Sequence, residues 1–369
     1  MAGRKRPRGD FVHQQMLTYL GNKRLLVSHI LELVGAGPLR ILDLFTGTGV
    51  VARALASRAS HIYANDLEEY ATLNATCFLV TPTPEDQVLV REHIAAANRL
   101  AEQGPHVAGV ITRHYAPADS SAIQAGERCF YTRENALRID TVRAYVAEHV
   151  PERLQAYVLA PLLIKCSVHT NTSGQFQAFH KNRDGVGQWG GHHRRSLARI
   201  TAPIVLECPE WGSAAQGHVT TLDAMACLDT FADGALDVIY LDPPYNQRQY
   251  SSLYFLLNIV ATNRMPEHVT PGGVTKAADR NDSVYCRKAA VRGAFEALLE
   301  VSTRKAARVI LSYNNEGLLS LAALDELLAA YQVTKHEFAH KRHNVRGDET
   351  AETPKTTREV MYVIRRAYY

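Results

Sequence analysis

The residues with the clearest chemical potential are Asp242-Pro243-Pro244-Tyr245, which directly follow the apolar run 236–241 (LDVIYL). Each proline fixes its own φ and lacks a backbone N–H, so the pair stiffens the chain and leaves carbonyl oxygens as its polar groups. The Asp242 carboxylate and the Pro243 carbonyl can therefore both accept hydrogen bonds from one amino group. The Tyr245 ring can stack on the base that carries this amine. The plain alternative is a proline-stiffened turn that only ends a strand.

A second pattern of this kind is the glycine-bearing turn Asp43 to Gly49 (DLFTGTG), which ends the apolar run 39–45. Glycine lets the backbone pass close to a ligand, and the amino end of the following helix favours an electronegative group. Asp66 comes about 20 residues later, at the end of the next strand candidate, where a carboxylate can accept hydrogen bonds from both ribose hydroxyls of a nucleoside. Because the full GxGxxG motif is absent, NAD fits poorly. The pattern predicts a site for another nucleoside cofactor.

Both patterns need parallel strands to position them. Strand, glycine turn, helix and strand in succession form a βαβ unit, and such units imply a parallel sheet. The strand candidates are 39–45, 61–65, 236–241, 308–312 and 359–364, and helical patterns lie at 50–57, 66–78, 249–262 and 318–331. The intervening part has helical patterns at 87–103, 135–149 and 153–165, then a polar, glycine-bearing stretch at 171–195. We predict one α/β domain made of 1–80 and 201–369, with a mostly helical domain inserted at 81–200.

Positive charge is concentrated in the stretch 165–199, although the net charge of the chain is only +4. Against the single acid Asp184, this stretch contains Lys165, Lys181, Arg183, Arg194, Arg195 and Arg199. Such an excess suits a polyanionic partner, but many solvated surfaces have it as well. Together with Phe176, Phe179 and Trp189, the stretch is predicted to face the groove of a nucleic acid. The alternative is a solvated loop with a few buried aromatic rings.

Taken in order, these segments resemble a known family. The matching segments are TYLGNK (18–23), the turn 43–49, Asp66, NTSGQFQAFHK (171–181), 218–224 with Asp223, DPPYNQRQY (242–250) and LSYNNEG (311–317). The chain is similar to the D12 class of DNA N6-adenine methyltransferases, of the α group and FokI-methyltransferase-like. It departs from the better-known members at Tyr19, where they have Trp, and at Asn22, where they have a second Gly. This departure puts the details of the Tyr19 cofactor contact in doubt.

The resemblance implies a Rossmann-like S-adenosylmethionine-dependent methyltransferase fold in which 81–200 is the target-recognition domain. It implies transfer of a methyl group from S-adenosylmethionine to N6 of a flipped adenine in double-stranded DNA, as part of restriction-modification. The implied catalytic residues are Asp242, Pro243, Pro244 and Tyr245. The implied cofactor residues are Tyr19, Lys23, Asp43, Phe45, Gly47, Gly49, Asp66, Asp223 and Asp242. For DNA contacts we predict Lys181, Arg183, Arg194, Arg195 and Arg248. No metal is expected, the enzyme is expected to act as a monomer, and a cognate endonuclease would be a separate chain.

Several alternatives share this fold. Cytosine N4 methylation and protein glutamine methylation are disfavoured, because those enzymes resemble this chain but usually have Ser or Asn in place of Asp242. RNA adenine methylation stays open, although the long insertion suits a duplex. A DNA-binding module without catalysis is a further alternative. The intact Asp43, Asp66 and Asp242 argue against it, since a decayed site would be free to lose them.

A competing motif is HEFAH at 336–340, with His343 nearby, which satisfies the HExxH zinc-peptidase pattern. That chemistry requires a helix, so that the two histidines share one face. The segment lacks a helical apolar stripe and follows a complete helical run, so we predict a strand or hairpin at the edge of the sheet. The pair His192-His193, beside two arginines, is interpreted as a solvated or DNA-facing loop.

The remaining features concern the cell compartment. No apolar run approaches the roughly 20 residues needed to span a bilayer. The charged amino terminus (MAGRKRPR) is not followed by an apolar stretch, so no signal peptide is expected. The six cysteines lie far apart, without the paired spacing of a zinc site. We expect reduced cysteines in a cytoplasmic protein that does not enter a membrane.

Overall fold

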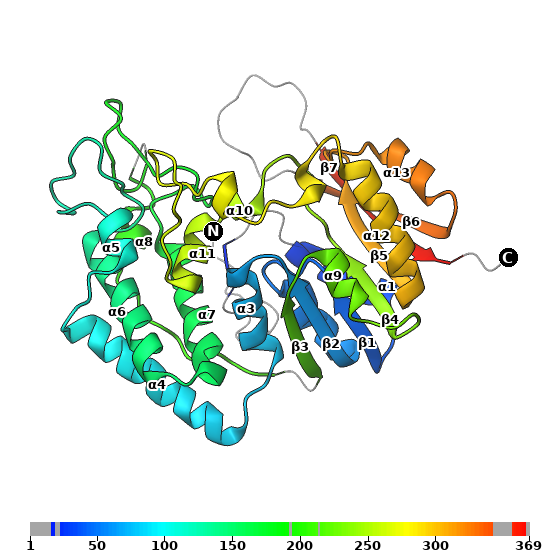
Figure 1. The fold of residues 1–369 in the computed structure, drawn as a ribbon, viewed down its shortest axis with the longest axis horizontal. Helices are drawn as coiled ribbons and strands as arrows, with labels where there is room; N and C mark the ends of the chain where they lie inside the picture. The colour runs from blue at the N-terminus through cyan, green and yellow to red at the C-terminus, as the bar shows by residue number, and fades with distance from the viewer. Residues whose placement is uncertain (1–15, 19–22, 192–193, 213–214, 342–355, 367–369) are drawn as a thin grey trace, which may run out of the picture.

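A mixed sheet of seven strands organises one half of the computed structural model, which describes residues 16–18, 23–191, 194–212, 215–341 and 356–366 (Figure 1). The strands are β1 (Leu39–Asp43), β2 (Ala59–Asp66), β3 (Gln216–Thr221), β4 (Leu236–Leu241), β5 (Ala306–Asn314), β6 (Gln332–Lys341) and β7 (Thr356–Arg365). Their order is β3-β2-β1-β4-β5-β7-β6. The first five run parallel, and β7 is antiparallel to both β5 and β6. This is the predicted Rossmann-like α/β fold.

The strand order reverses between β1 and β4, and this reversal determines where a ligand can bind. In open parallel sheets, the crevice outside the carboxyl ends of the strands at such a point is the usual binding site. Asp43, the last residue of β1, pairs in register with Tyr240 of β4. Asp242 therefore leaves the sheet beside Asp43, although the two residues are about 200 positions apart in the chain.

Two layers of helices cover the sheet, and side-chain alternation along the strands decides which layer each residue contacts. Ile41 and Val238 point to the face covered by α1 (Val27–Val34), α2 (Val50–Leu55) and the end of α3 (Glu69–Leu79). Their neighbours Leu42 and Ile239 point to the face covered by α9 (Ala224–Asp229), α12 (Val291–Lys305) and α13 (Leu321–Leu328). With both faces buried, β4 reads as an almost continuous apolar run.

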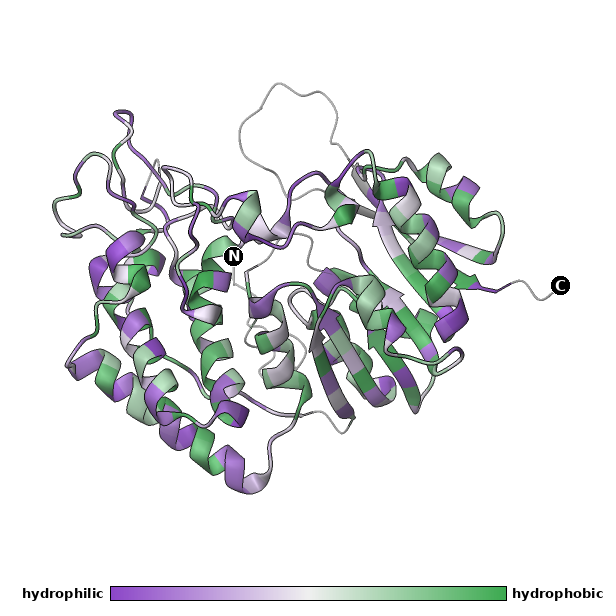
Figure 2. Ribbon diagram, viewed as in Figure 1, coloured by the Kyte–Doolittle hydropathy of each residue, from purple (hydrophilic) through white to green (hydrophobic). Residues whose placement is uncertain are grey.

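The other half of the molecule is a helical lobe. Its helices are α4 (Pro84–Gln103), α5 (Val110–His114), α6 (Arg133–His149), α7 (Glu152–His169) and α8 (Leu197–Thr201), as Figure 1 shows. The central helix α7 is buried along most of its length, whereas the outer α4 buries only one face, with its hydrophilic residues turned outward (Figure 2). The predicted helices at 87–103, 135–149 and 153–165 are confirmed as α4, α6 and α7.

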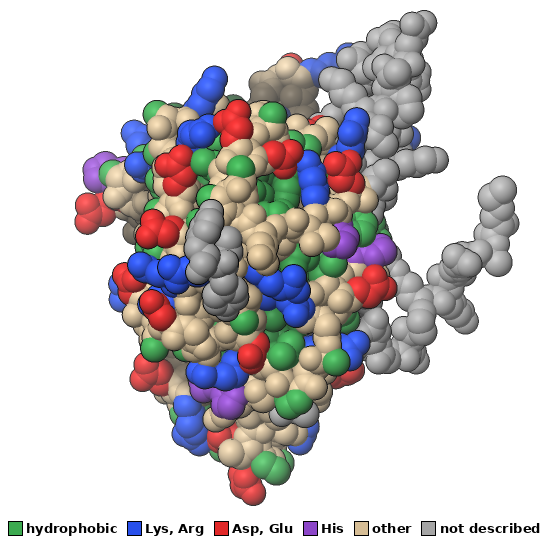
Figure 3. Space-filling model, turned by 90° about the vertical axis from the view of Figure 1, so that its right-hand side faces the viewer, with side chains coloured by type: hydrophobic (Ala, Val, Ile, Leu, Met, Phe, Trp, Pro, Cys, Tyr) green, Lys and Arg blue, Asp and Glu red, His purple; other side chains and the backbone are tan. Residues whose placement is uncertain are grey.

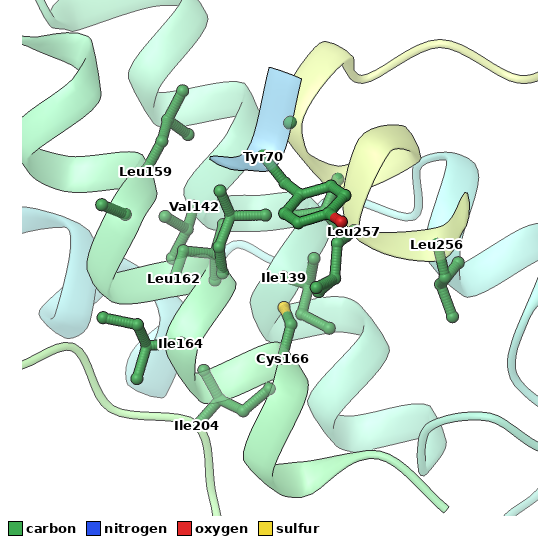
Figure 4. Packing of buried hydrophobic residues seen from close by; sticks show 14 of the residues in the cluster. Tyr70, Ile139, Val142, Leu159, Leu162, Ile164, Cys166, Ile204, Leu256 and Leu257 are labelled. Atoms are coloured by element: carbon green, nitrogen blue, oxygen red, sulfur yellow. The ribbon is translucent and has the colours of Figure 1, made fainter. Parts of the chain in front are cut away.

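The lobe shares its core with two elements that belong to the sheet half in sequence. Tyr70 of α3 and Leu257 of α11 (Phe255–Thr262) pack among Ile139 and Val142 of α6 and Leu162 of α7 (Figure 4). The helix α11 follows the Asp-Pro-Pro-Tyr segment after the short α10 (Tyr250–Leu253). The segment predicted as one helix at 249–262 is thus two helices, and the second one anchors the lobe to the chain that follows β4.

The stretch 171–191 folds back on the lobe around one buried amide. The Asn171 side chain donates to the carbonyls of Cys129 and Gln188, at 2.9 and 3.1 Å, and accepts from the N–H of Gly190. Its backbone bonds to Phe130 and His180. Asn171 is fully buried, so these contacts replace water for several backbone groups at once.

The predicted orientation of the aromatic residues in this stretch was wrong. Phe176 and Phe179 are buried in the core of the lobe, and the half-buried Trp189 donates its indole N–H to the Ser120 carbonyl. Basic side chains of the stretch, by contrast, are exposed. The alternative interpretation, a solvated loop with buried aromatics, therefore describes these rings. Apolar rings are worth more in a core than against a hydrophilic groove.

The zinc interpretation of HEFAH is excluded because this segment is a strand and not a helix. His336 and His340 lie in the edge strand β6, as the predicted strand required. Residues four apart in a strand are separated by about 13 Å, too far to share one zinc ion. His343 and His192-His193 lie outside the described residues. Among the described residues no group of three metal-binding side chains comes together, and all six cysteines are free.

No helix in the described ranges combines the length and the apolarity that crossing a bilayer demands.

Replacing Asn171 by Ala should lower the free energy of unfolding by about 2–6 kcal/mol, because at least two buried backbone groups lose their partners at about 1–3 kcal/mol each. The matched control is Asn182→Ala. The exposed Asn182 side chain caps a turn in the same stretch by accepting from the N–H groups of Asp184 and Val186. Its loss should change the stability by less than about 1 kcal/mol. Urea denaturation of both variants measures the difference, and equal losses would contradict the central role of Asn171.

Candidate active site

The Asp-Pro-Pro-Tyr segment and the glycine turn with Asp66 line one cavity at the carboxyl ends of β1, β2 and β4. This cavity has a volume of about 960 Å³ and is open to solvent. Ten of the predicted site residues line it: Lys23, Asp43, Phe45, Gly47, Asp66, Asp223, Asp242, Pro243, Pro244 and Tyr245. Gly49 and Arg248 do not line it, and Tyr19 lies outside the described residues.

The glycine turn is held in shape by Asp66. Its carboxylate accepts from the N–H of Gly47 at 2.7 Å and from the N–H of Glu68 at 3.0 Å. Gly49 begins α2 with a φ of 73°, in the left-handed region that glycine tolerates best. Gly49 thus shapes the turn, while Gly47 forms the wall of the cavity. Burial raises the pKa of Asp66 to about 6.

Two further carboxyl groups lie deep in the cavity wall. Burial and the neighbouring charge of Asp242 raise the pKa of Asp43 to about 8. Burial also raises the pKa of Glu68 to about 8, although its carboxylate accepts a hydrogen bond from the Asn258 side chain of α11. At neutral pH without a ligand, both groups are therefore largely protonated. Glu68 was not predicted as a site residue, because nothing in the sequence links it to Asn258.

Asp242 is held by a buried ammonium group. Lys23 Nζ lies 3.1 Å from Asp242 Oδ1 and 3.6 Å from Glu359 Oε2, and the Lys23 side chain is only 4% exposed. Burial alone would lower the pKa of Lys23, but the two carboxylates outweigh it and raise the pKa above its ordinary value. The same ammonium lies 5.6 Å from the centre of the Tyr245 ring. Lys23 thus stays charged and contacts both the first and the last residue of the Asp-Pro-Pro-Tyr segment, Asp242 and Tyr245.

The pKa of Asp242 results from two influences that raise it and one that lowers it. Burial raises it, the Lys23 charge lowers it, and the Glu359 charge raises it, so that it reaches about 6. Asp242 is therefore mostly ionised at neutral pH and able to accept hydrogen bonds. Glu359 is the first residue of the strand pattern EVMYVI, and only its position beside Asn314 of β5 brings it to this site. The strand at 359–364 was predicted from the sequence, but the position of the Glu359 carboxylate beside Lys23 and Asp242 was not.

The Tyr245 ring is fixed from the side of the sheet. Its backbone carbonyl accepts from the N–H of Leu318 at 2.7 Å, and its ring meets that of Tyr313 edge to face, 6.5 Å between centres. Tyr245 is only half-buried and lines the cavity. A flat ligand can therefore lie against the part of the ring that protein atoms leave uncovered.

The loop between α11 and α12 closes one side of the cavity. The Gln249 side chain exchanges two hydrogen bonds with the backbone of Ser283, at 2.7 and 3.0 Å, and the Asn281 side chain donates to the Leu67 carbonyl. Tyr285 meets Phe45 edge to face, 5.3 Å between ring centres. The loop was not predicted, because its polar residues carry no spacing that stands out in the sequence.

The predicted DNA-binding residues lie away from the cavity wall. Arg248 is exposed and contacts Gln175 at 3.4 Å, and Lys181, Arg183, Arg194 and Arg195 are exposed on the lobe. None of these five forms an ion pair with a described acid. The end of the molecule that carries α12 and α13 differs, because Lys and Arg there are interspersed with Asp and Glu (Figure 3). The contact of these five residues with DNA stays a prediction.

Comparison with known proteins now decides the family. The profile described as D12 class N6 adenine-specific DNA methyltransferase matches residues 19–186 and 214–320. These two ranges make up most of the chain. The protein belongs to the D12 class of N6 adenine-specific DNA methyltransferases.

Individual relatives of this D12 enzyme agree with the profile. Type II methyltransferase M.NlaIII of Neisseria lactamica is 30% identical over 304 residues, which cover 78% of this chain and 79% of the relative. M.CviAII of Paramecium bursaria Chlorella virus 1 is 28% identical, covering 85% of this chain and 88% of its own. M.FokI of Planomicrobium okeanokoites is 26% identical, covering 85% of this chain, which spans about half the length of that relative (47%). The predicted resemblance is therefore confirmed.

Two substitutions in this D12 enzyme should shift its pH dependence in opposite directions. Lys23→Met removes the charge that lowers the pKa of Asp242, so that pKa should rise above about 6 and the acid limb of kcat should move to higher pH. Glu359→Gln removes a charge that raises the pKa of Asp242, so the acid limb should move to lower pH. Rates of methyl transfer at saturating substrate, measured from about pH 5 to 9, test both.

The matched control for this pair is Glu337→Gln. Glu337 is an exposed carboxylate on the neighbouring strand β6, outside the cavity. Its variant should keep the acid limb of the wild type. A shift of the limb in the same direction for Lys23→Met and Glu359→Gln would show that Asp242 does not control it.

Proposed function

We propose that the enzyme transfers a methyl group from S-adenosylmethionine to the exocyclic N6 of an adenine that is flipped out of a specific duplex DNA sequence. One observation carries the proposal: Asp242-Pro243-Pro244-Tyr245 shares a single cavity with the Gly47 turn and Asp66. An amine acceptor and a nucleoside site thus open into the same space. Direct transfer between two substrates requires such a space.

The residues of the cavity fit S-adenosylmethionine. Asp43 Oδ1 is buried and has no hydrogen-bond partner among the described residues, and a ligand amino group would satisfy it and lower the pKa of this carboxyl again. Asp66 would accept from the ribose hydroxyls, Phe45 would pack against the adenine ring, and Asp223 would accept from its amine. When bound, S-adenosylmethionine supplies a sulfonium methyl group that a nucleophile can displace.

Asp242 and Pro243 would prepare the substrate nitrogen. The adenine amine is a poor nucleophile because its lone pair delocalises into the ring. Asp242 Oδ1 faces Lys23, which leaves the other carboxylate oxygen for the amine, and no described residue donates to the Pro243 carbonyl. Two acceptors on the N–H groups aim the lone pair at the methyl group, so that much of the acceleration comes from orientation.

The charge that develops during transfer falls on the same two acceptors. As the new N–C bond forms and the bond from sulfur to the methyl carbon breaks, the amine nitrogen becomes cationic, and the fixed carboxylate and carbonyl stabilise it. The product ammonium is strongly acidic, so one proton passes to Asp242 or to water without a strong base. No covalent intermediate on the protein is needed.

Flipping the adenine out of the duplex costs a few kcal/mol. Stacking on an aromatic ring offsets about 1–3 kcal/mol per base, and Tyr245 is the ring that offers this contact beside Asp242. We also propose that the enzyme acts as a monomer in the cytoplasm, as the modification half of a restriction-modification pair whose endonuclease is a separate chain. The relatives named type II methyltransferases support the restriction-modification part of this proposal.

Replacing Asp242 by Ala should abolish methylation, since the amine loses its charged acceptor, while binding of S-adenosylmethionine is at least partly retained. The matched control is Asp237→Ala in β4, the strand that precedes Asp242, because Asp237 is exposed and outside the cavity. Incorporation of labelled methyl groups into DNA and equilibrium dialysis of labelled cofactor measure the two effects. Long-read sequencing of the wild-type product identifies the modified base and its sequence context.

Methylation retained by Asp242→Ala would refute the role of this carboxylate. Wild-type protein that binds DNA and cofactor without methyl transfer would instead support the DNA-binding module that has lost catalysis. Incorporation into RNA but not into duplex DNA would favour the RNA alternative.

A further inference from the structure

The lobe contains a second hollow that none of the catalytic chemistry uses. This groove, which we call the lobe groove, lies between the carboxyl end of α7, the loop at 172–174, the turn at 190–191 and the start of α8, and its volume is about 1200 Å³. Its lining combines Arg195, Arg199 and His180 with several hydroxyl side chains, among them Thr170, Thr172 and Ser196. No Asp or Glu is among the described residues that line it.

The charges of the lobe groove are not balanced within the protein. Arg195 and Arg199 form no ion pair with any residue that the structure describes, whereas Lys165 near the same helix end pairs with Glu207. Burial lowers the pKa of His180, and the positive charge of Arg199 lowers it further. Cationic and donor groups thus collect here without an anion.

The carboxyl end of α7 works against an anion in the lobe groove. Carbonyl groups at the carboxyl end of a helix carry about half a negative charge in total. Two guanidinium groups carry two full positive charges, so the balance in the lobe groove remains positive. The backbone carbonyl of Arg199 is already engaged, because it accepts a hydrogen bond from His169 at 2.6 Å.

The lobe groove lies close to the catalytic cavity. Thr18 lines the groove and Lys23 lines the cavity, and five residues can span at most about 18 Å. The loop that lines the groove continues into a segment held against α10 and the chain before it. Phe176 donates its N–H to Leu253 O at 2.8 Å, and Gln175 accepts from Arg248 at 3.4 Å. The position of the groove relative to Asp242 is therefore set by short connections.

We propose that the lobe groove binds a phosphodiester group of the substrate DNA, close to the adenine that is flipped. Arg195 and Arg199 supply the charge, and the hydroxyls of Thr172 and Ser196 supply further donors. Arginine and hydroxyl side chains are the usual partners of backbone phosphates, which fix the position of the duplex without reading its sequence. Rotating a base out of the stack moves its backbone, so a nearby phosphate contact would hold the duplex in place during the flip. This inference rests on the proposed function.

The test uses the full-length protein and the variants Arg195→Gln and Arg199→Gln. Each lost phosphate contact should reduce the slope of log K against log salt concentration by about 0.9. Affinity should fall about tenfold or more for each lost charge-assisted contact. The loss should be equal for duplexes with and without the methylation site. KM for DNA should rise, while the KM for S-adenosylmethionine stays unchanged.

The matched control is Arg113→Gln. Arg113 is an exposed arginine of α5 in the same lobe and does not line the groove, so its variant should keep the wild-type salt slope. Arg195 is exposed as well, so its replacement leaves the core intact, and thermal unfolding confirms this for every variant. If Arg199→Gln unfolds, the salt slope of Arg195→Gln decides the question alone.

Three outcomes separate the explanations. An unchanged salt slope for Arg195→Gln, with a wild type that methylates DNA, overturns the lobe groove as a phosphate site and leaves the proposed function intact. A wild type that methylates no DNA sinks the proposed function itself. Competition by inorganic phosphate that both variants abolish, without any change in DNA affinity, would make the groove a site for free anions and would overturn its role in DNA binding.

Discussion

The candidate active site is organised around one buried ion contact, the Lys23 ammonium between Asp242 and Glu359. A carboxylate taken out of water tends to become neutral, and the burial of Asp242 acts in that direction. Lys23 opposes this effect and keeps Asp242 an acceptor at neutral pH. The contact also connects three parts of the chain that are remote in sequence, since Lys23 precedes β1, Asp242 follows β4 and Glu359 lies in β7. Loss of any one of them changes the charge at or around Asp242, the acceptor that we propose for the substrate amine.

The second constraint is the shared core between the lobe and the sheet. Because α11 follows the Asp-Pro-Pro-Tyr segment and packs against α3 and α7, the lobe cannot move freely relative to the catalytic strand. The contact between Glu68 and Asn258 extends this connection to the wall of the cavity. A protein that must place one base within reach of a methyl donor benefits from such rigidity, since an error of about 1 Å at the reacting atoms can cost 10²-fold in rate.

The sequence predicted the parts of this arrangement that are local. The glycine turn, the Asp-Pro-Pro-Tyr segment and the long helices each carry their own short pattern, and parallel strands bring the ends of β1 and β4 together by rule. The edge strand β3 escaped prediction because its residues are mostly exposed and hydrophilic. Glu359 and Glu68 escaped because their partners, Lys23 and Asn258, lie hundreds of positions away. The orientation of Phe176 and Phe179 was misjudged, since neighbouring charges say nothing about which side a ring takes.

The short segment from Thr18 to Lys23 relates these constraints to each other. At one end, the Thr18 N–H donates to the Ser167 hydroxyl of α7 at 3.1 Å, beside the lobe groove. At the other end, the Lys23 ammonium meets Asp242. Five steps along the chain, from Thr18 to Lys23, thus separate the surface proposed to hold the DNA backbone from the site proposed to accept the flipped amine. Their extended length bounds that distance at about 18 Å. Both ends are held by contacts between described residues, so the proposed phosphate contact and the proposed acceptor of the amine lie within a short distance of each other.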